Sequence, residues 1–179
     1  MKNLRFIAAF FIFGLVSQTF VWGQQWRDIT SNSQLVGKWE GSVDMPMPSF
    51  DDFGISNFSM KITFFMELPR GSDKITMAVK MDMGKFLDVL AISPELGGMF
   101  TKDQLWELIT MEAANSPEYT IGNDYSITVD ISESIDDFLS DDVKIQIDTR
   151  GNRIKLIFTE PWALDFVDNE INEVILNKR

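Results

Sequence analysis

Alternation of apolar and polar residues is the feature that most constrains this chain, because a period of two is the pattern of a half-buried β-strand. The clearest run extends from Lys74 to Met83, and a second extends from Phe58 to Leu68, where Phe65 alone breaks the alternation. Weaker runs cover residues 35–43, 118–121, 125–131, 143–147, 154–158 and 173–179. The pattern predicts about eight antiparallel strands, most with one apolar and one polar face.

The period changes between residues 85 and 114. Phe86, Leu87 and Leu90 are spaced as on one side of a helix, and Thr101 is followed three residues later by Gln104, which is a capping-box pattern. Leu105, Leu108 and Ile109 form one apolar stripe. The sequence therefore predicts a mainly β protein with a two-helix insertion at residues 85–114, after the third strand. The segment 44–54, with two prolines and three aspartates, is expected to be a flexible loop.

The first 23 residues have the organisation of a signal peptide. Lys2 and Arg5 precede an apolar run at residues 6–16, and Val21 and Gly23 fit the small-residue positions before a cleavage site. A membrane anchor is the alternative, but the run is shorter than the ~20 residues that span a bilayer. We expect cleavage after Gly23, a single mature domain at residues 24–179, and a secreted or periplasmic protein without a stable membrane span.

Composition excludes several classes of function. The chain has no His and no Cys, which removes the commonest general base, thiolate nucleophile and transition-metal ligands. With 16 basic and 27 acidic residues, the net charge of −11 argues against binding to nucleic acid. The acidic pairs Asp136-Asp137 and Asp141-Asp142 lack the spacing of a calcium loop. We therefore expect no enzyme, no metal site and no cofactor.

The start of the first long strand carries a short motif, Leu35-x-Gly37-x-Trp39. It resembles the calycin superfamily, which includes the lipocalins and the fatty-acid-binding proteins. The resemblance implies an antiparallel up-and-down β-barrel of about eight strands. It further implies that Gly37 allows close entry of the chain, that Trp39 plugs the closed end, and that a late basic residue, Lys178 rather than Arg179, lies across the indole. Ordinary core packing is the alternative role of Trp39.

Two neighbouring strands place a methionine-rich row on one face. Methionine is unbranched and polarizable, so it lines adaptable apolar surfaces. The row predicts a cavity wall for a small hydrophobic ligand that is neutral or lipid-like, since the lysines of these strands fall on the polar face. A solid core is the alternative. The predicted wall consists of Met60, Ile62, Phe64, Met66, Met77, Val79, Met81 and Met83.

A second hypothesis is an envelope protein-interaction or inhibitor module with a solid barrel and no ligand. Its contact surface would be an apolar patch on the helices at residues 85–114 and on the loop at residues 44–54. The two helices would act either as a mobile lid or as a fixed plug. The residues proposed for the contact surface are Phe50, Phe53, Met99, Phe100 and Trp106. Catalysis by the remaining Asp, Glu, Lys and Tyr side chains ranks last.

Overall fold

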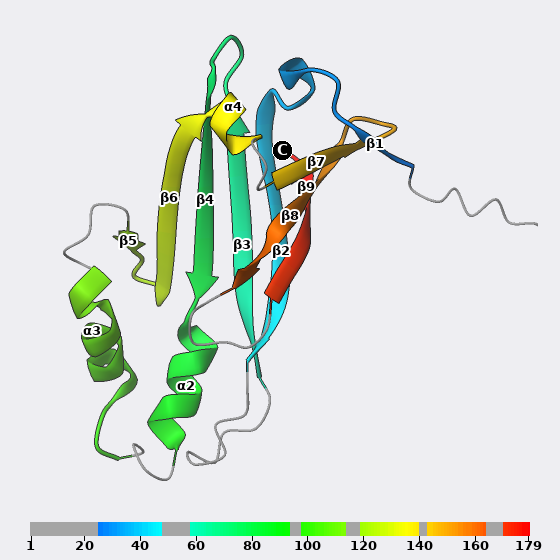
Figure 1. The fold of residues 1–179 in the computed structure, drawn as a ribbon. Coiled ribbons are helices and arrows are strands. Elements are labelled where there is room, and N and C mark those ends of the chain that lie inside the picture. Colours follow the sequence, from blue (N-terminus) through cyan, green and yellow to red (C-terminus); the bar gives the residue numbers. More distant parts are fainter. Residues whose placement is uncertain (1–24, 48–57, 94–97, 114–118, 140–142, 164–169) are drawn as a thin grey trace, which may run out of the picture.

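The structure of the protein is a computed structural model that describes residues 25–47, 58–93, 98–113, 119–139, 143–163 and 170–179 (Figure 1). The predicted signal peptide with its cleavage site at Gly23 lies outside the described residues, as do Phe50 and Phe53.

Nine strands and four short helical segments follow one another along the described chain. Among the helical segments, α2 and α3 follow the third long strand, as the change of period predicted. The strands are β1 (Trp26–Asp28), β2 (Gly37–Met47), β3 (Phe58–Leu68), β4 (Lys74–Asp82), β5 (Tyr119–Ile121), β6 (Ser126–Ser134), β7 (Val143–Asp148), β8 (Arg153–Ala163) and β9 (Glu170–Lys178). The helical segments are the 3-10 turn η1 (Asn32–Gln34) and the helices α2 (Gly84–Ile92), α3 (Lys102–Ala113) and α4 (Ile135–Phe138).

All nine strands belong to one antiparallel sheet, in the order β1-β7-β8-β9-β2-β3-β4-β6-β5. The prediction of a mainly β fold is confirmed. The last long strand pairs with the first one, through Trp39 opposite Lys178. A closed barrel would also need β6 to pair with β7, but these two strands do not pair in the described part of the chain.

The predicted closed barrel is therefore wrong. Closure of the barrel needs hydrogen bonds between β6 and β7. The edge of each strand that would form them is instead partly paired with a three-residue strand. On β6, residues 127–129 pair with β5, and on β7, residues 146–148 pair with β1. Helix α4 connects to the end of β6, where Ser134 caps it by accepting a hydrogen bond from the backbone N–H of Asp137 at 3.1 Å. The result is a strongly curved open sheet.

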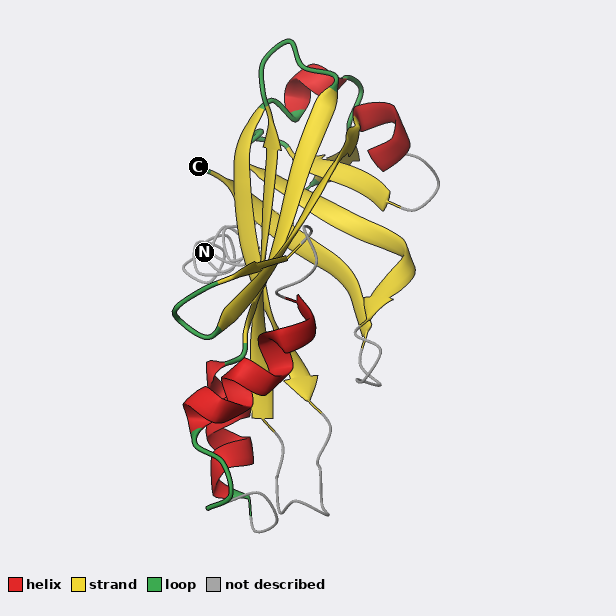
Figure 2. Cartoon of the chain, turned by 90° about the vertical axis from the view of Figure 1, so that its left-hand side faces the viewer, coloured by secondary structure: helices red, strands yellow, loops and turns green. Residues whose placement is uncertain are grey.

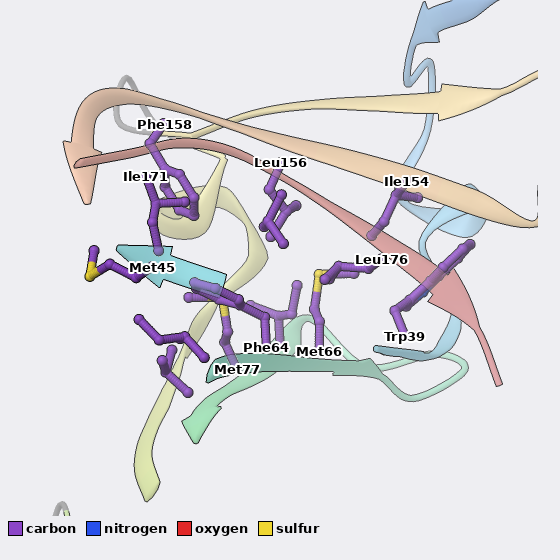
Figure 3. Packing of buried hydrophobic residues seen from close by; sticks show 14 of the residues in the cluster. Trp39, Met45, Phe64, Met66, Met77, Ile154, Leu156, Phe158, Ile171 and Leu176 are labelled. Carbon is purple, nitrogen blue, oxygen red and sulfur yellow. The ribbon is translucent and has the colours of Figure 1, made fainter. Parts of the chain in front are cut away.

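The core lies inside this curve. Side chains from β2, β3 and β4 face those from β8 and β9, as Figure 3 shows. Phe64 and Phe158 meet across the interior with their ring centroids 6.2 Å apart. Strand β2 extends through Met45 and Met47, both buried, so residues 44–47 belong to this strand and not to the expected loop at residues 44–54, the rest of which lies outside the described residues. The apolar faces predicted from alternation thus pack against each other as two layers of one bent sheet.

Helices α2 and α3 lie together at one end of the sheet (Figures 1 and 2). Among their described side chains, Leu87 and Leu105 are the buried apolar ones, and Thr110 of α3 is also buried. Lys102 bridges the two helices by an ion pair with Asp88 at 2.6 Å. The hydroxyl of Tyr125 donates to Asp103 at 2.5 Å and ties α3 to the start of β6. No helix in the described ranges has both the length and the apolar character needed to cross a bilayer.

Candidate functional site

One end of the curved sheet is sealed around Trp39. Its side chain is 1% exposed, and its indole N–H donates to the carbonyl oxygen of Leu35 at 2.7 Å. Lys178 Nζ lies 5.0 Å from the ring centroid, which is the contact that the motif resemblance implies. Gly37 has a φ of 127°, and a Cβ there would lie 3.2 Å from Lys178 Cε. The motif residues and Lys178 thus form one packed unit between the first and last long strands.

The β3 half of the predicted ligand wall is filled. Met60, Ile62, Phe64 and Met66 are at most 1% exposed. A cavity beside a side chain leaves some of its surface accessible to a water-sized sphere, so no such space adjoins these four side chains on the inner face of the sheet. The side chains of this row pack directly against those of β8 and β9 (Figure 3). Contact of a ligand with this half would require the two layers to separate.

The β4 half of the wall is less enclosed. Met77 and Val79 are 7% and 3% exposed, and Met81 is half-buried. Met83 lies beyond the end of β4 at the start of α2, where its backbone N–H donates to the carbonyl of Tyr125 at 2.9 Å. Met83 is therefore a junction residue between sheet and helix, although alternation placed it on the strand.

The unclosed side of the sheet exposes apolar residues of the inner face. Residues that pair directly on neighbouring strands share a face, and Ile131 pairs with Met77, Val129 with Val79 and Ile127 with Met81. Along this row Ile127 is 8% exposed and Val129 is half-buried, whereas Ile131 is 40% exposed. We call the six residues Ile127, Val129, Ile131, Met77, Val79 and Met81 the open-side cluster. Alternation predicts that Ile131 lies on the apolar face. It does not predict that Ile131 is exposed, because this exposure results from the lack of a neighbouring strand, which the local sequence does not indicate.

Four carboxylates lie on the second half of β6 and on the helix that follows it. Asp130 is exposed on the outer face of β6, and Glu133, opposite Ile75, is a half-buried charge on the inner face. Asp136 and Asp137 are exposed on α4. None of these four takes part in the ion pairs found between described residues. The edge of β6 is therefore negatively charged.

A second apolar surface lies at the helical end. Met99 and Phe100, expected at a protein contact, are 71% and 38% exposed. Trp106 is half-buried and packs edge-on against Tyr125 at a centroid distance of 5.8 Å, so it anchors α3. The expected inward stripe is wrong at Leu108, which points to solvent at 51% exposure. Exposed apolar residues that sequence reasoning did not single out for a contact are Ile92, Leu108 and Met111.

Shifted pKa values mark structural ion pairs on the surface. Hydrogen bonds from Lys80 and Ser126 lower the pKa of Asp124 to about 2. The hydrogen bond to Asp103 raises the pKa of Tyr125 above its ordinary value. Asp124 is exposed, whereas Tyr125 is half-buried and packs against Trp106. Within the described residues, no three acidic side chains gather as a metal site.

A hollow on the outer surface has both aromatic and charged residues in its lining. It encloses about 260 Å³ beside Phe65, Lys38 and Arg179. Arg179 lies over the Phe65 ring at 5.7 Å and forms an ion pair with Glu40. Phe65, the residue that breaks the alternation, is thus covered by a structural ion pair.

Comparison with known proteins adds no family to this geometry: neither family models, nor curated proteins, nor solved structures matched the chain. The function must therefore be argued from the open-side cluster and the helical surface themselves.

Proposed function

We propose that this chain is an exported binding protein that takes up a hydrophobic ligand at the open-side cluster. The observation that carries the proposal is Ile131, an inner-face residue with 40% of its surface exposed in a row whose other members are buried or half-buried. Exposed apolar surface inside a concave sheet is stabilised when a ligand covers it, at about 25 cal/mol for each Å² removed from water.

The charges favour a ligand without a buried anionic head. On the described parts of β3 and β4, Lys61 and Lys80 lie on the outer face, since their sequence neighbours point inward. Glu133 is an inner-face charge of β6, and it repels anions. A neutral ligand, or one whose basic group reaches the acidic edge, fits this arrangement. The flexible thioethers of Met77 and Met81 can adapt to its shape.

The proposal also includes the expected location of the protein, the resemblance of its first long strand and the predicted ligand wall. The proposed location is the periplasm or the exterior, by cleavage of residues 1–23. The resemblance to calycins through Leu35, Gly37 and Trp39 supports ligand carriage rather than catalysis. The end of the sheet that is sealed by Trp39 lies opposite the end at which β6 approaches α2. Ligand contact is proposed for the β4 half of the wall first, because the β3 half is filled.

The test uses N-phenyl-1-naphthylamine, a neutral dye that fluoresces in apolar surroundings. We expect the purified mature chain to bind it and Ile131→Ser to weaken binding about fivefold, from the loss of about 1 kcal/mol of apolar contact. The matched control is Ile175→Ser on β9, since Ile175 is 37% exposed but lies opposite Lys155 on the outer face. Equal dye binding by the Ile131 and Ile175 variants would contradict the proposal.

A second candidate function is protein binding through α2 and α3. It is favoured by Ile92, Leu108 and Met111, whose exposed fractions are 80%, 51% and 61%. Apolar surface of this kind is typical of contact sites. Chemical cross-linking in the producing cells should yield an adduct that Leu108→Lys with Met111→Lys abolishes while dye binding is unchanged. An adduct that survives the double substitution would contradict this candidate.

A further inference from the structure

The edge of β6 has a free stretch next to the open-side cluster. Strand β5 pairs with residues 127–129, and beyond this point residues 130–134 have β4 as their one partner strand in the described chain. Five residues of strand measure about 17 Å. An unpaired edge of this length presents backbone N–H and C=O groups that another extended chain can bond.

The side chains along this stretch alternate in character. Ile131 projects to the inner face opposite Met77, whereas Asp130 and Ser132 project to the outer face opposite Ala78 and Thr76. A strand laid beside β6 has the same alternation of faces. Its inner side chains would lie beside Ile131 and Glu133, and its outer side chains would lie beside Asp130 and Ser132.

Charge determines the outer side chains of such a strand. Asp130, Asp136 and Asp137 are exposed at this edge, whereas the half-buried Glu133 lies on the inner face of β6. Cross-strand pairs of opposite charge are stabilising and like charges are destabilising. A second copy of this chain joined edge to edge would bring two sets of these carboxylates together, so the edge disfavours self-association and favours a basic partner.

We propose that the ligand of the open-side cluster is an extended segment of another protein, with alternating apolar and basic side chains, that adds to β6 at residues 130–134 as a new strand. This inference rests on the proposed function, because it names the chemical class of the hydrophobic ligand. Backbone hydrogen bonds supply affinity in strand addition, and the alternate side chains supply selectivity. The edge strands β1 and β5 offer three residues each and are shorter sites.

The experiment uses a synthetic peptide that alternates lysine and valine. Its controls are a peptide that alternates glutamate and valine and a lysine–valine peptide of scrambled order. Amide hydrogen exchange of the mature chain is followed by NMR with and without peptide. We expect protection to increase at residues 130–134 with the alternating basic peptide alone, and residues 74–82 of β4 to stay unchanged.

Variants separate the two parts of the recognition. Peptide affinity should fall about fivefold in Ile131→Ser through lost apolar contact and by a similar factor in Asp130→Lys through repulsion of lysine. Ile175→Ser should bind like the unchanged chain. Asp130→Lys should leave binding of the neutral dye unchanged, since Asp130 lies on the outer face.

The outcomes distinguish this inference from the proposed function. Dye binding that depends on Ile131, together with no peptide protection at residues 130–134, would overturn the strand and leave a small apolar molecule as the ligand. Protection that rises with protein concentration in the absence of peptide would overturn it in favour of a second copy. If the unchanged mature chain bound neither the dye nor the peptide, both proposals would be overturned.

Discussion

Gly41 tests the junction that makes the sheet nearly circular. It lies on β2, where β9 crosses closely, and it is buried. A Cβ at this position would lie 2.9 Å from the carbonyl carbon of Ile175 and 2.9 Å from Leu176 Cδ2, and closer still to the carbonyl oxygen of Ile175. Ordinary contacts of a Cβ are 3.4–4 Å. Since the obstacle is backbone, β9 has to move away from β2 in Gly41→Ala.

The cost follows from what this movement disturbs. Val174 and Leu176, 1% and 0% exposed, are the β9 side chains that would lose packing. Overpacking a core costs about 1–3 kcal/mol, and a clash with backbone belongs at the upper end. We expect Gly41→Ala to lower the free energy of unfolding by about 3 kcal/mol. For a chain of this size, that corresponds to a fall in Tm of about 6–12 °C.

The assay is urea unfolding followed by tryptophan fluorescence, because Trp39 is buried beside the same junction. The matched control is Gly71→Ala. Gly71 has a φ of +77°, and a Cβ at this position would have no other atom within 4 Å, so the alanine carries conformational strain of about 1 kcal/mol without a clash. A Gly41 variant as stable as the Gly71 variant would refute the close approach of β2 and β9.

Two further predictions concern single contacts. Lys178→Ala should lower the free energy of unfolding by about 0.5–1 kcal/mol through loss of the cation–π contact with Trp39, and Lys178→Arg should retain it; equal losses in urea unfolding would contradict the contact. Asp124 has a folded-state pKa of about 2, below its ordinary 3.8. Its stabilisation is therefore present above about pH 4 and is lost as the pH falls from about 4 to 2. Asp124→Asn should be less stable than the unchanged chain at about pH 6, and the gap should close at about pH 2; a gap that is constant over this range would contradict the depressed pKa.

Strand content was predictable because alternation is a local property. The rows on β3 and β4 were assigned to the correct face, since burial of every second residue requires one face to be apolar. A basic residue over Trp39 is expected from the resemblance of the Leu35-x-Gly37-x-Trp39 motif, and the alternation of Val174, Leu176 and Lys178 along one strand favours Lys178 over Arg179. Closure of the sheet was not predictable: β1 and β5 have three residues each, too few to show a period, yet they occupy the edges that a barrel would join.

The candidate site was only half predictable for the same reason. Ile131 carries the same local signal as Ile127, and their exposed fractions of 40% and 8% differ through the absence of a neighbouring strand at one of them. On α3, Leu105 and Leu108 both fit a helical stripe, but only Leu105 meets the sheet. Which part of an apolar face stays uncovered depends on contacts between elements distant in sequence.

In the described chain, β6 and β7 are unpaired, while β2 and β9 pair. NMR cross-strand contacts between backbone protons measure both in one experiment on the unliganded mature chain. We predict contacts between Trp39 and Lys178, which serve as the internal reference, and none between residues 130–134 and 143–146. A ladder of contacts joining residues 130–134 to residues 143–146 would show a closed barrel and would contradict the account.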